Sequence, residues 1–358
     1  MMAKRPEEII RDDIRALTAY HVPESAGMVK LDAMENPYGL PAALRARLAR
    51  LIEDAALNRY PDSGAGELKS RLRESFGVPK TAALLLGNGS DEIIQMLVLG
   101  AARPGAVVLG VEPSFTMFRM ISAFAGVPFV AVGLGEDFGL DTGRVLEAIE
   151  QHRPGLIFLA CPNNPTGNLF DIDAIERVIA SAPGMVVIDE AYHAFAEQTF
   201  MTRLPHYPNL LVMRTLSKIG LAGLRLGVLA GREEWIAQLD KLRLPYNVST
   251  LTQMVACEVL KHGAVLTEQA AAIKLERGRL LRELQGIRGV TAYPSAANFI
   301  LFRISHAERV FDGLIQRGVL VKSLHGSHHL LADCLRVTVG TPEENNAFLA
   351  ALTRTLNA

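Results

Sequence analysis

From about residue 84 to residue 229 the chain alternates short, continuously apolar runs with longer segments of helical pattern. Runs that are apolar at every position fit strands buried on both faces, and intervening helices supply the crossovers that parallel strands need. The alternation therefore predicts an α/β fold whose mostly parallel sheet is sandwiched by helices. The expected strands are Ala83–Leu86, Val107–Leu109, Phe129–Val132, Leu156–Ala160, Met185–Ile188, Leu210–Met213 and Leu226–Ala230. The expected helices are Asp91–Ala101, Phe115–Ala125, Thr142–Gln151 and Ile172–Ala180.

The pattern changes after Pro245, where a long helical region over Leu251–Leu284 precedes three short apolar runs. A last helix opens at Thr341, a capping residue followed by proline and acids. The expected strands here are Phe299–Phe302, Val319–Val321 and Leu335–Val339. We expect a small α+β domain over residues 251–358, a large domain over 42–250, and an N-terminal arm over 1–41 that packs with the small domain.

Composition argues against several classes of partner. The chain has 358 residues, 49% of them hydrophobic, and a net charge of −1, so no overall field recruits nucleic acid or an anionic membrane. Its charged N-terminus lacks the apolar core of a signal peptide, and its apolar runs are too short to span a bilayer. Three widely separated cysteines predict neither a disulfide framework nor a metal site, and favour the cytoplasm.

Lys218 stands in the segment Arg214-Thr215-Leu216-Ser217-Lys218, and two other polar motifs precede it. Asp189 ends an apolar run with Tyr192 three residues further on, and Asn164 lies in the motif Asn163-Asn164-Pro165-Thr166-Gly167. A lysine amine forms imines and moves protons, while a carboxylate at the end of a parallel strand points into the crevice where α/β proteins bind ligands. Together they are the groups that pyridoxal 5′-phosphate (PLP) chemistry needs.

Each of these residues also has a structural interpretation. Lys218 could be a solvated loop lysine, Asp189 a helix cap and Tyr192 a packed aromatic residue. The turn Gly87–Asp91 follows a strand and opens a helix, and free amides at a helix N-terminus bind phosphate. Ser217 and the forked cation of Arg225 would complete a phosphate site there.

The chain resembles fold-type-I, PLP-dependent aminotransferases over essentially its whole length, and among them the histidinol-phosphate aminotransferase branch. The segments that carry the resemblance to this branch are Leu17–Tyr20, Glu35–Gly39, Asn58–Pro61, Pro245–Asn247 and Leu335–Gly340. The resemblance implies a homodimer with shared active sites. It also implies transamination of L-histidinol phosphate with 2-oxoglutarate, giving imidazole-acetol phosphate and glutamate in histidine biosynthesis. Two alternatives stay open: an aromatic amino-acid aminotransferase and a related PLP-dependent decarboxylase of a phosphorylated amino acid.

The resemblance also implies roles for individual residues. Those implied at the cofactor ring are the Schiff-base lysine Lys218, the pyridinium partner Asp189, the ring-oxygen ligands Tyr192 and Asn164, and the stacking residue Phe115. Those implied at the phosphate are Ser90, Asp91, Ser217, Arg225 and, from the neighbouring subunit, Tyr60. Those implied on the substrate side are Tyr20, Asn298, Lys322 and Arg336.

Lys322 is a departure from the family's pattern, which often has a second arginine after this strand. Lysine is a point charge and lacks the bidentate fork of arginine, although a phosphate accepts either. Lys322 is therefore expected either to contact the substrate or to be an exposed side chain.

Overall fold

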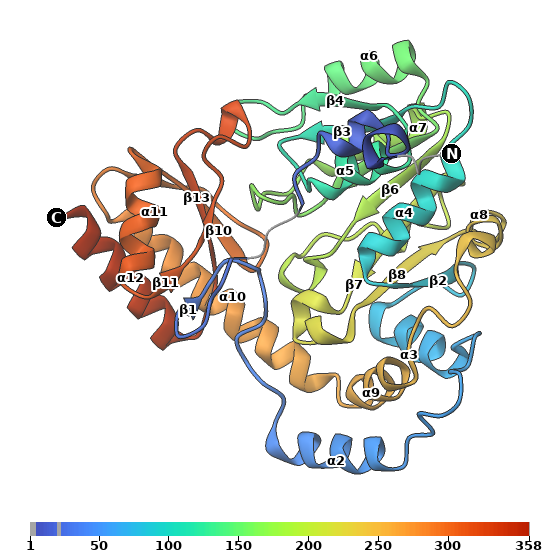
Figure 1. Ribbon diagram of the computed structural model, residues 1–358, viewed down its shortest axis with the longest axis horizontal. Helices are drawn as coiled ribbons and strands as arrows, with labels where there is room; N and C mark the ends of the chain where they lie inside the picture. The colour runs from blue at the N-terminus through green and yellow to red at the C-terminus, as the bar shows by residue number, and fades with distance from the viewer. Residues whose placement is uncertain (1–4, 20–22, 358) are drawn as a thin grey trace.

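The computed structural model describes residues 5–19 and 23–357, and within them a seven-stranded sheet forms the centre of the larger body (Figure 1). Strand β8 is antiparallel to both of its neighbours, and the other pairs are parallel. The strands, in spatial order, are β2 (Ala83–Asn88), β8 (Leu226–Gly231), β7 (Leu210–Thr215), β6 (Met185–Asp189), β5 (Leu156–Ala160), β3 (Val108–Glu112) and β4 (Phe129–Gly133). The predicted mostly parallel α/β sheet is confirmed.

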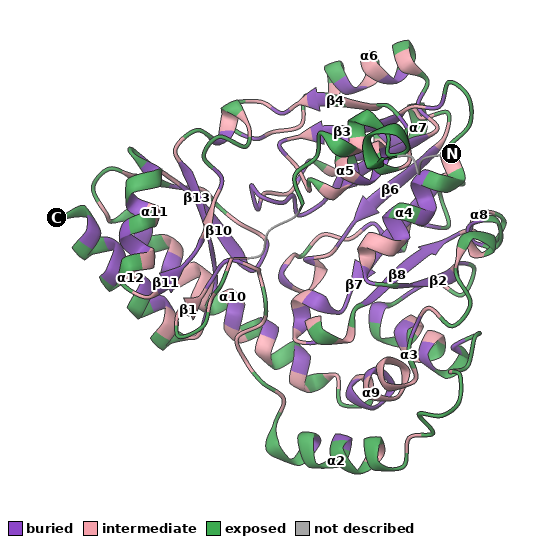
Figure 2. Ribbon diagram, in the orientation of Figure 1, coloured by how far each residue is buried: buried purple, intermediate pink, exposed green. Residues whose placement is uncertain are grey.

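Helices cover both faces of this sheet, because successive side chains of a strand point to opposite sides. On β6, Val187 packs with Phe118 on one side, and Val186 belongs to the cluster that contains Ile175 on the other. The inner strands β5, β6, β7 and β8 are buried along their length, whereas the edge strand β4 is only partly buried (Figure 2). Helices on the Val187 side are α4 (Ser90–Ala101), α5 (Met117–Phe124) and α8 (Glu233–Leu239). Helices on the Val186 side are α3 (Gly66–Phe76), α6 (Thr142–His152), α7 (Ile172–Ser181) and α9 (Thr250–Lys261).

The smaller body contains a four-stranded antiparallel sheet with its own apolar cluster. Its strands, in spatial order, are β12 (Lys322–Ser323), β13 (Cys334–Thr338), β10 (Phe299–Ile304) and β9 (Val290–Ala292). The accompanying helices are α10 (Ala264–Gln285), α11 (Ala307–Gln316) and α12 (Pro342–Leu356). Helix α12 begins with the predicted cap, because Thr341 and Glu344 form a reciprocal capping box.

Two features of this half differ from the sequence prediction. The long helical region consists of α9 and α10, separated at His262 and Gly263. The strand expected over Val319–Val321 ends at Leu320: β11 (Val319–Leu320) pairs with β1 (Val29–Lys30), whereas β12, which begins only at Lys322, pairs with β13. The sequence does mark the first break, because Lys261, His262 and Gly263 form a basic last turn followed by glycine, whereas the break at Val321 lies inside a continuous apolar run.

The N-terminal arm contacts both bodies. Strand β1 adds to the small body, where Thr338 N also donates to Leu31 O at 2.8 Å. Near α1 (Asp12–Arg15), the Arg11 guanidinium donates to Ala123 O of α5 at 2.7 Å. Helix α2 (Ala42–Glu53) then packs against α9. In the part of the chain described, no helix is long and apolar enough to cross a membrane.

Candidate active site

A cavity opens where the parallel strands β5, β6 and β7 end. Parallel strands present their carboxyl ends at one edge, so Ala160, Asp189 and Thr215 all line it. The arm closes it through Met34. The cavity gathers nine of the residues predicted at the cofactor, namely Ser90, Asp91, Phe115, Asn164, Asp189, Tyr192, Ser217, Lys218 and Arg225.

Asp189 is the last residue of β6, and its carboxyl group is buried at the cavity wall. Its Oδ1 accepts a hydrogen bond from Ala191 N at 3.0 Å. Burial raises the pKa of the Asp189 carboxyl to about 7, because the interior disfavours the charged form. A cation placed against this carboxylate would favour its ionised form.

Lys218 lies in the short 3₁₀ turn Ser217–Ile219 that follows β7. Burial, together with the positive charge of Arg336, lowers the pKa of the Lys218 amine to about 8. The Nζ atom donates to Ala33 O of the arm at 3.3 Å. Lys218 is therefore an amine whose uncharged form is accessible close to neutral pH, which a nucleophile or a general base requires.

Tyr192 and Asn164 lie on the same cavity and meet groups from other segments. The Tyr192 hydroxyl donates to the Met34 sulfur at 3.0 Å, and burial raises the pKa of Tyr192, so this group stays protonated. Asn164 Oδ1 accepts from Arg336 Nη1 at 2.6 Å. Arg336, on β13, also donates to Asp32 O at 2.8 Å. The small sheet thus delivers a buried guanidinium to the rim of a cavity built by the large sheet.

The glycine turn before α4 lies at the cavity, as predicted for a phosphate site, because Ser90 and Asp91 line the cavity. Gly89 caps the helix with φ of +85°, and a Cβ there would lie 2.7 Å from Arg225 Nη2. A Cβ on Gly227 would come within 2.7 Å of Ser90 N. Arg225 Nη2 donates to Asp91 Oδ2 at 3.3 Å and remains half exposed. The two glycines therefore let β8 and Arg225 approach the start of α4 closely, and Ser90, Asp91 and Arg225 line the cavity there, where helix amides and a guanidinium can bind a phosphate.

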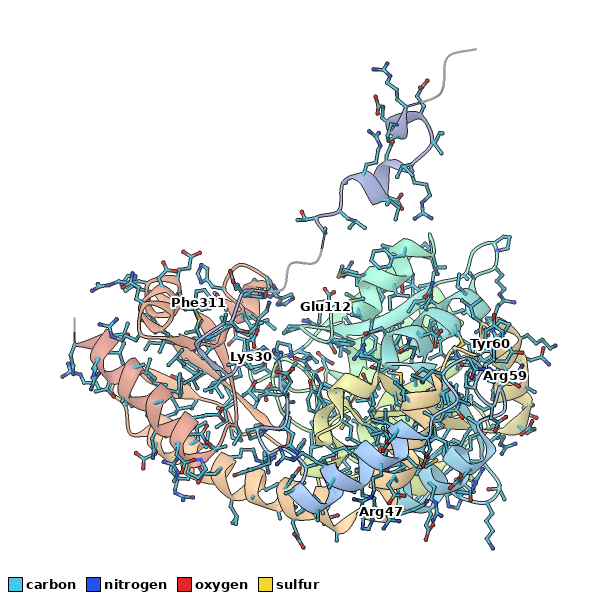
Figure 3. The ribbon with its side chains drawn as sticks, turned by 60° about the horizontal axis from the view of Figure 1, so that its bottom comes forward. Lys30, Arg47, Arg59, Tyr60, Glu112 and Phe311 are labelled. Carbon is cyan, nitrogen blue, oxygen red and sulfur yellow. The ribbon has the colours of Figure 1, made fainter. Side chains whose placement is uncertain are left out.

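The remaining predicted residues lie differently. Phe115 lines the cavity and meets Phe118 edge to face at 5.5 Å. Tyr60 lies outside this cavity, 79% exposed, with its ring stacked on Tyr246 at 4.3 Å. Figure 3 shows Tyr60 beside Arg59 on the outer side of the large body, well away from Lys30 of the arm. Tyr20 lies outside the described residues.

Asn298 and Lys322 are both close to the site without lining this cavity. Asn298 is fully buried, and its amide donates to Met34 O at 2.9 Å, so it holds the arm. Lys322 pairs in register with Arg336 on the neighbouring strand, which places the two cations on the same face of the small sheet.

Sequence reasoning missed the segment that follows β1. Asp32, Ala33 and Met34 contact Arg336, Lys218 and Tyr192 in turn. Met34 adopts a left-handed backbone with φ of +56°, fixed by Thr338 Oγ1 and Asn298. The only sequence signal for this segment was its position just before the motif Glu35–Gly39. The arm has no apolar periodicity, so its pairing with the small sheet could not be predicted.

Three comparisons bear on this geometry. The profile of the family Aminotransferase class I and II matches residues 26–352. Histidinol-phosphate aminotransferase 2 of Cupriavidus pinatubonensis is 54% identical over 355 residues, covering 98% of this chain and 97% of the relative. Histidinol-phosphate aminotransferase 1 of Ralstonia nicotianae is 52% identical, covering 97% of this chain and 94% of the relative.

A solved structure shows the same fold. The histidinol-phosphate aminotransferase of Sinorhizobium meliloti in complex with pyridoxal 5′-phosphate superposes with a TM-score of 0.87, at 23% identity and covering 98% of both chains. The chain belongs to the class I and II aminotransferase family. Members of this family are PLP-dependent enzymes, so the predicted enzyme class and cofactor are confirmed.

Proposed function

We propose that the protein transfers the amino group of L-histidinol phosphate to 2-oxoglutarate, giving imidazole-acetol phosphate and glutamate in histidine biosynthesis. The observation that carries the proposal is the cavity, where an amine, a carboxylate and the start of helix α4 with Arg225 meet at the ends of parallel strands. The relatives at 54% and 52% identity, both named histidinol-phosphate aminotransferases, support the choice of substrate.

The residues of the cavity fit pyridoxal phosphate. Asp189 is a buried carboxyl group with a raised pKa. A protonated ring nitrogen beside it would be a counter-charge that favours its ionised form. The start of α4 and the Arg225 side chain, both at the cavity, would bind a phosphate through backbone amides and a guanidinium. Tyr192 and Asn164 offer hydrogen bonds to a ring oxygen from the same wall. When bound, the cofactor supplies an aldehyde that takes up the amino group and a ring that accepts an electron pair.

Within this arrangement Lys218 has two tasks. Its Nζ would hold the cofactor covalently until an amino substrate replaces it. The released amine would then take the proton from the substrate carbon and return it elsewhere, which suits a base whose pKa is about 8. Asp189 would keep its negative charge against the ring nitrogen throughout, and burial excludes the water that would weaken this attraction.

Arg336 is the group we assign to the anionic end of both substrates. Its buried guanidinium reaches the cavity rim through Asn164 and can bind carboxylate or phosphate in a forked geometry. Lys322, its register partner, would add a second positive charge for the phosphate of histidinol phosphate. We also place Tyr20 and Asn298 on the substrate side, as the family resemblance implies.

The proposal includes a homodimer. Tyr60 is an exposed aromatic residue stacked on Tyr246, and Leu57 and Leu244 beside them are 64% and 69% exposed. An apolar surface of this kind marks a protein interface. A second copy would cover it, and Tyr60 would reach the partner's cofactor phosphate. The three cysteines are free and buried, which suits a reducing compartment, and we propose the cytoplasm.

A half-reaction tests the proposal directly. The PLP-loaded protein is mixed with L-histidinol phosphate in the absence of any keto acid, and the cofactor spectrum is followed, with glutamate and phenylalanine in parallel. We expect rapid conversion to the pyridoxamine form with histidinol phosphate and glutamate, and slow conversion with phenylalanine. Conversion by phenylalanine but not by histidinol phosphate would move the substrate to the aromatic amino acids. A further sample contains a phosphorylated amino acid, because histidinol phosphate has no carboxyl group to lose, and release of carbon dioxide from it would indicate the decarboxylase.

A further inference from the structure

A buried ion pair lies behind the site, on the opposite face of the same strand ends. Glu190 follows Asp189 and Arg214 precedes Thr215, so alternation turns both away from the cavity. Glu190 is 1% exposed and Arg214 is 6% exposed. Arg214 donates to Glu190 Oε2 twice, from Nε at 2.9 Å and from Nη2 at 2.8 Å. The pair therefore ties the end of β6 to the end of β7.

The same pair also binds two further segments, the turn at Thr199 and Phe200 and the end of α3. Thr199 Oγ1 donates to Glu190 Oε2 at 2.9 Å and accepts from Arg214 Nη2 at 2.8 Å. The amide of Phe200 donates to Glu190 Oε1. Arg214 Nη1 donates to Phe76 O, at the end of α3, at 2.9 Å. The carboxylate and the guanidinium are thus held in one orientation from several sides.

Stability alone is a poor reason for such a pair. Apolar residues of similar volume in place of a buried ion pair are often neutral or stabilising, because the desolvation cost of both charges disappears. The pair does supply directional bonds between two strand ends, and a small misplacement of reacting groups can cost a large factor in rate.

We propose that Glu190 and Arg214 are a positioning pair that sets β6 against β7, so that Asp189 and Lys218 meet the bound cofactor in the correct relative placement. Asp189 is joined directly to Glu190, and Lys218 lies four residues beyond Arg214. The inference rests on the function proposed above for the cavity. It assigns a role to two residues that touch neither cofactor nor substrate.

The test replaces the pair by apolar residues in the PLP-loaded protein, as the double variant Glu190→Leu/Arg214→Met. We expect the double variant to remain folded, with a kcat lower by about tenfold or more because the reacting groups shift. The KM should stay within about twofold, since Arg336 is untouched. The visible circular dichroism band of the bound cofactor, which reports its asymmetric surroundings, should weaken.

Arg203→Met is the matched control. Arg203 donates to Thr199 O at 3.2 Å and lies over the Phe200 ring, so it contacts the same turn, but it pairs with Glu176 of α7. We expect its kcat and its cofactor band to equal those of the wild type. A kcat loss in Arg203→Met as large as in the double variant would overturn the positioning role.

A folded double variant with wild-type kcat and an unchanged cofactor band would also overturn it. If the double variant does not fold, Arg214→Lys decides, because it keeps the charge and loses the fork. A kcat reduced by about fivefold at unchanged KM supports the proposal, and a wild-type kcat contradicts it. The wild type is measured first: absence of transamination there rejects the proposed function, whereas an active wild type with an equally active variant rejects only the positioning role.

Discussion

The two faces of β6 and β7 bury charged side chains at the same strand ends and treat them in opposite ways. On the reverse face Glu190 and Arg214 bond to each other at 2.8 Å. On the cavity face Asp189 and Lys218 bond to backbone groups instead, at Ala191 N and Ala33 O. Burial moves the pKa of Asp189 up to about 7 and that of Lys218 down to about 8.

This difference shows which of the two faces needs a ligand to balance its buried charges. A buried ion without a counter-charge costs free energy, and the cost falls when a partner arrives. The reverse face contains its own partners and so is complete without cofactor. On the cavity face, the Asp189 carboxylate and the Lys218 amine would find their partners on the cofactor, in its ring nitrogen and its aldehyde. Variants on the two faces should therefore differ in their effects on activity and on stability.

Lys218→Ala should have the largest effect, because it removes both the covalent attachment and the base. We expect turnover to fall by about 10⁴-fold or more while the folded protein persists. Steady-state kinetics and circular dichroism measure both quantities. Lys241→Ala, at an exposed helix end, is the control and should behave as the wild type. Wild-type turnover in Lys218→Ala would contradict the assignment.

Asp189→Asn and Glu190→Gln compare the two faces directly. Asp189→Asn should lower kcat by about 10²–10³-fold, because the amide cannot balance the ring nitrogen. It should leave the thermal midpoint of the cofactor-free protein unchanged or higher, since a buried charge is removed. Glu190→Gln should lower that midpoint, because Arg214 loses its counter-charge at a cost of about 3 kcal/mol. Calorimetry of the cofactor-free proteins measures both midpoints. A decrease of the thermal midpoint in both variants would contradict the difference between the two faces.

Arg336→Ala and Lys322→Ala compare a buried with a partly buried cation on the substrate side. Arg336 is 6% exposed and its guanidinium contacts Asn164 of the cavity, so we expect its loss to slow both half-reactions by about 10²-fold. Lys322 is only partly buried, and its loss should weaken binding of histidinol phosphate by a few-fold and leave glutamate unaffected. Single-turnover spectroscopy of each half-reaction measures both. Wild-type rates in Arg336→Ala for both substrates would remove it from the site.

The pH dependence of stability should show the smallest effect. The folded protein holds the Asp189 proton up to a pKa of about 7, whereas the unfolded chain releases it at the ordinary, lower pKa. The stabilisation from this group is therefore present at low pH and is lost as the pH rises toward 7. The thermal midpoint of the cofactor-free wild type should fall more than that of Asp189→Asn between about pH 5 and about pH 8. Parallel curves would contradict the raised pKa.

The part of the cavity that could be predicted from the sequence is the part where reactive side chains directly follow predicted strands. Asp189 and Lys218 follow apolar strands, and parallel strands bring their carboxyl ends to one edge, so their meeting followed from the pattern. Arg225 and Ser90 were placed by glycine turns for a similar reason. The prediction that these residues bind the cofactor stays a prediction, tested by the variants above.

Other parts could not be predicted because no local pattern encodes them. Met34 reaches Tyr192 only because β1 pairs with β11, nearly 300 residues away in sequence. The Glu190–Arg214 pair depends on the register between β6 and β7. Tyr60 lies apart from the cavity of its own chain, so its proposed role depends on a second copy.

The most direct measurement is chemical trapping of the lysine. The PLP-loaded protein is reduced with borohydride, which makes the bond between lysine and cofactor permanent, and is then digested and sequenced by mass spectrometry. We expect one modified lysine, Lys218. We also expect the modification to be lost when histidinol phosphate is added before reduction. Modification of another lysine, or none at all, would contradict the central claim that this cavity holds the cofactor.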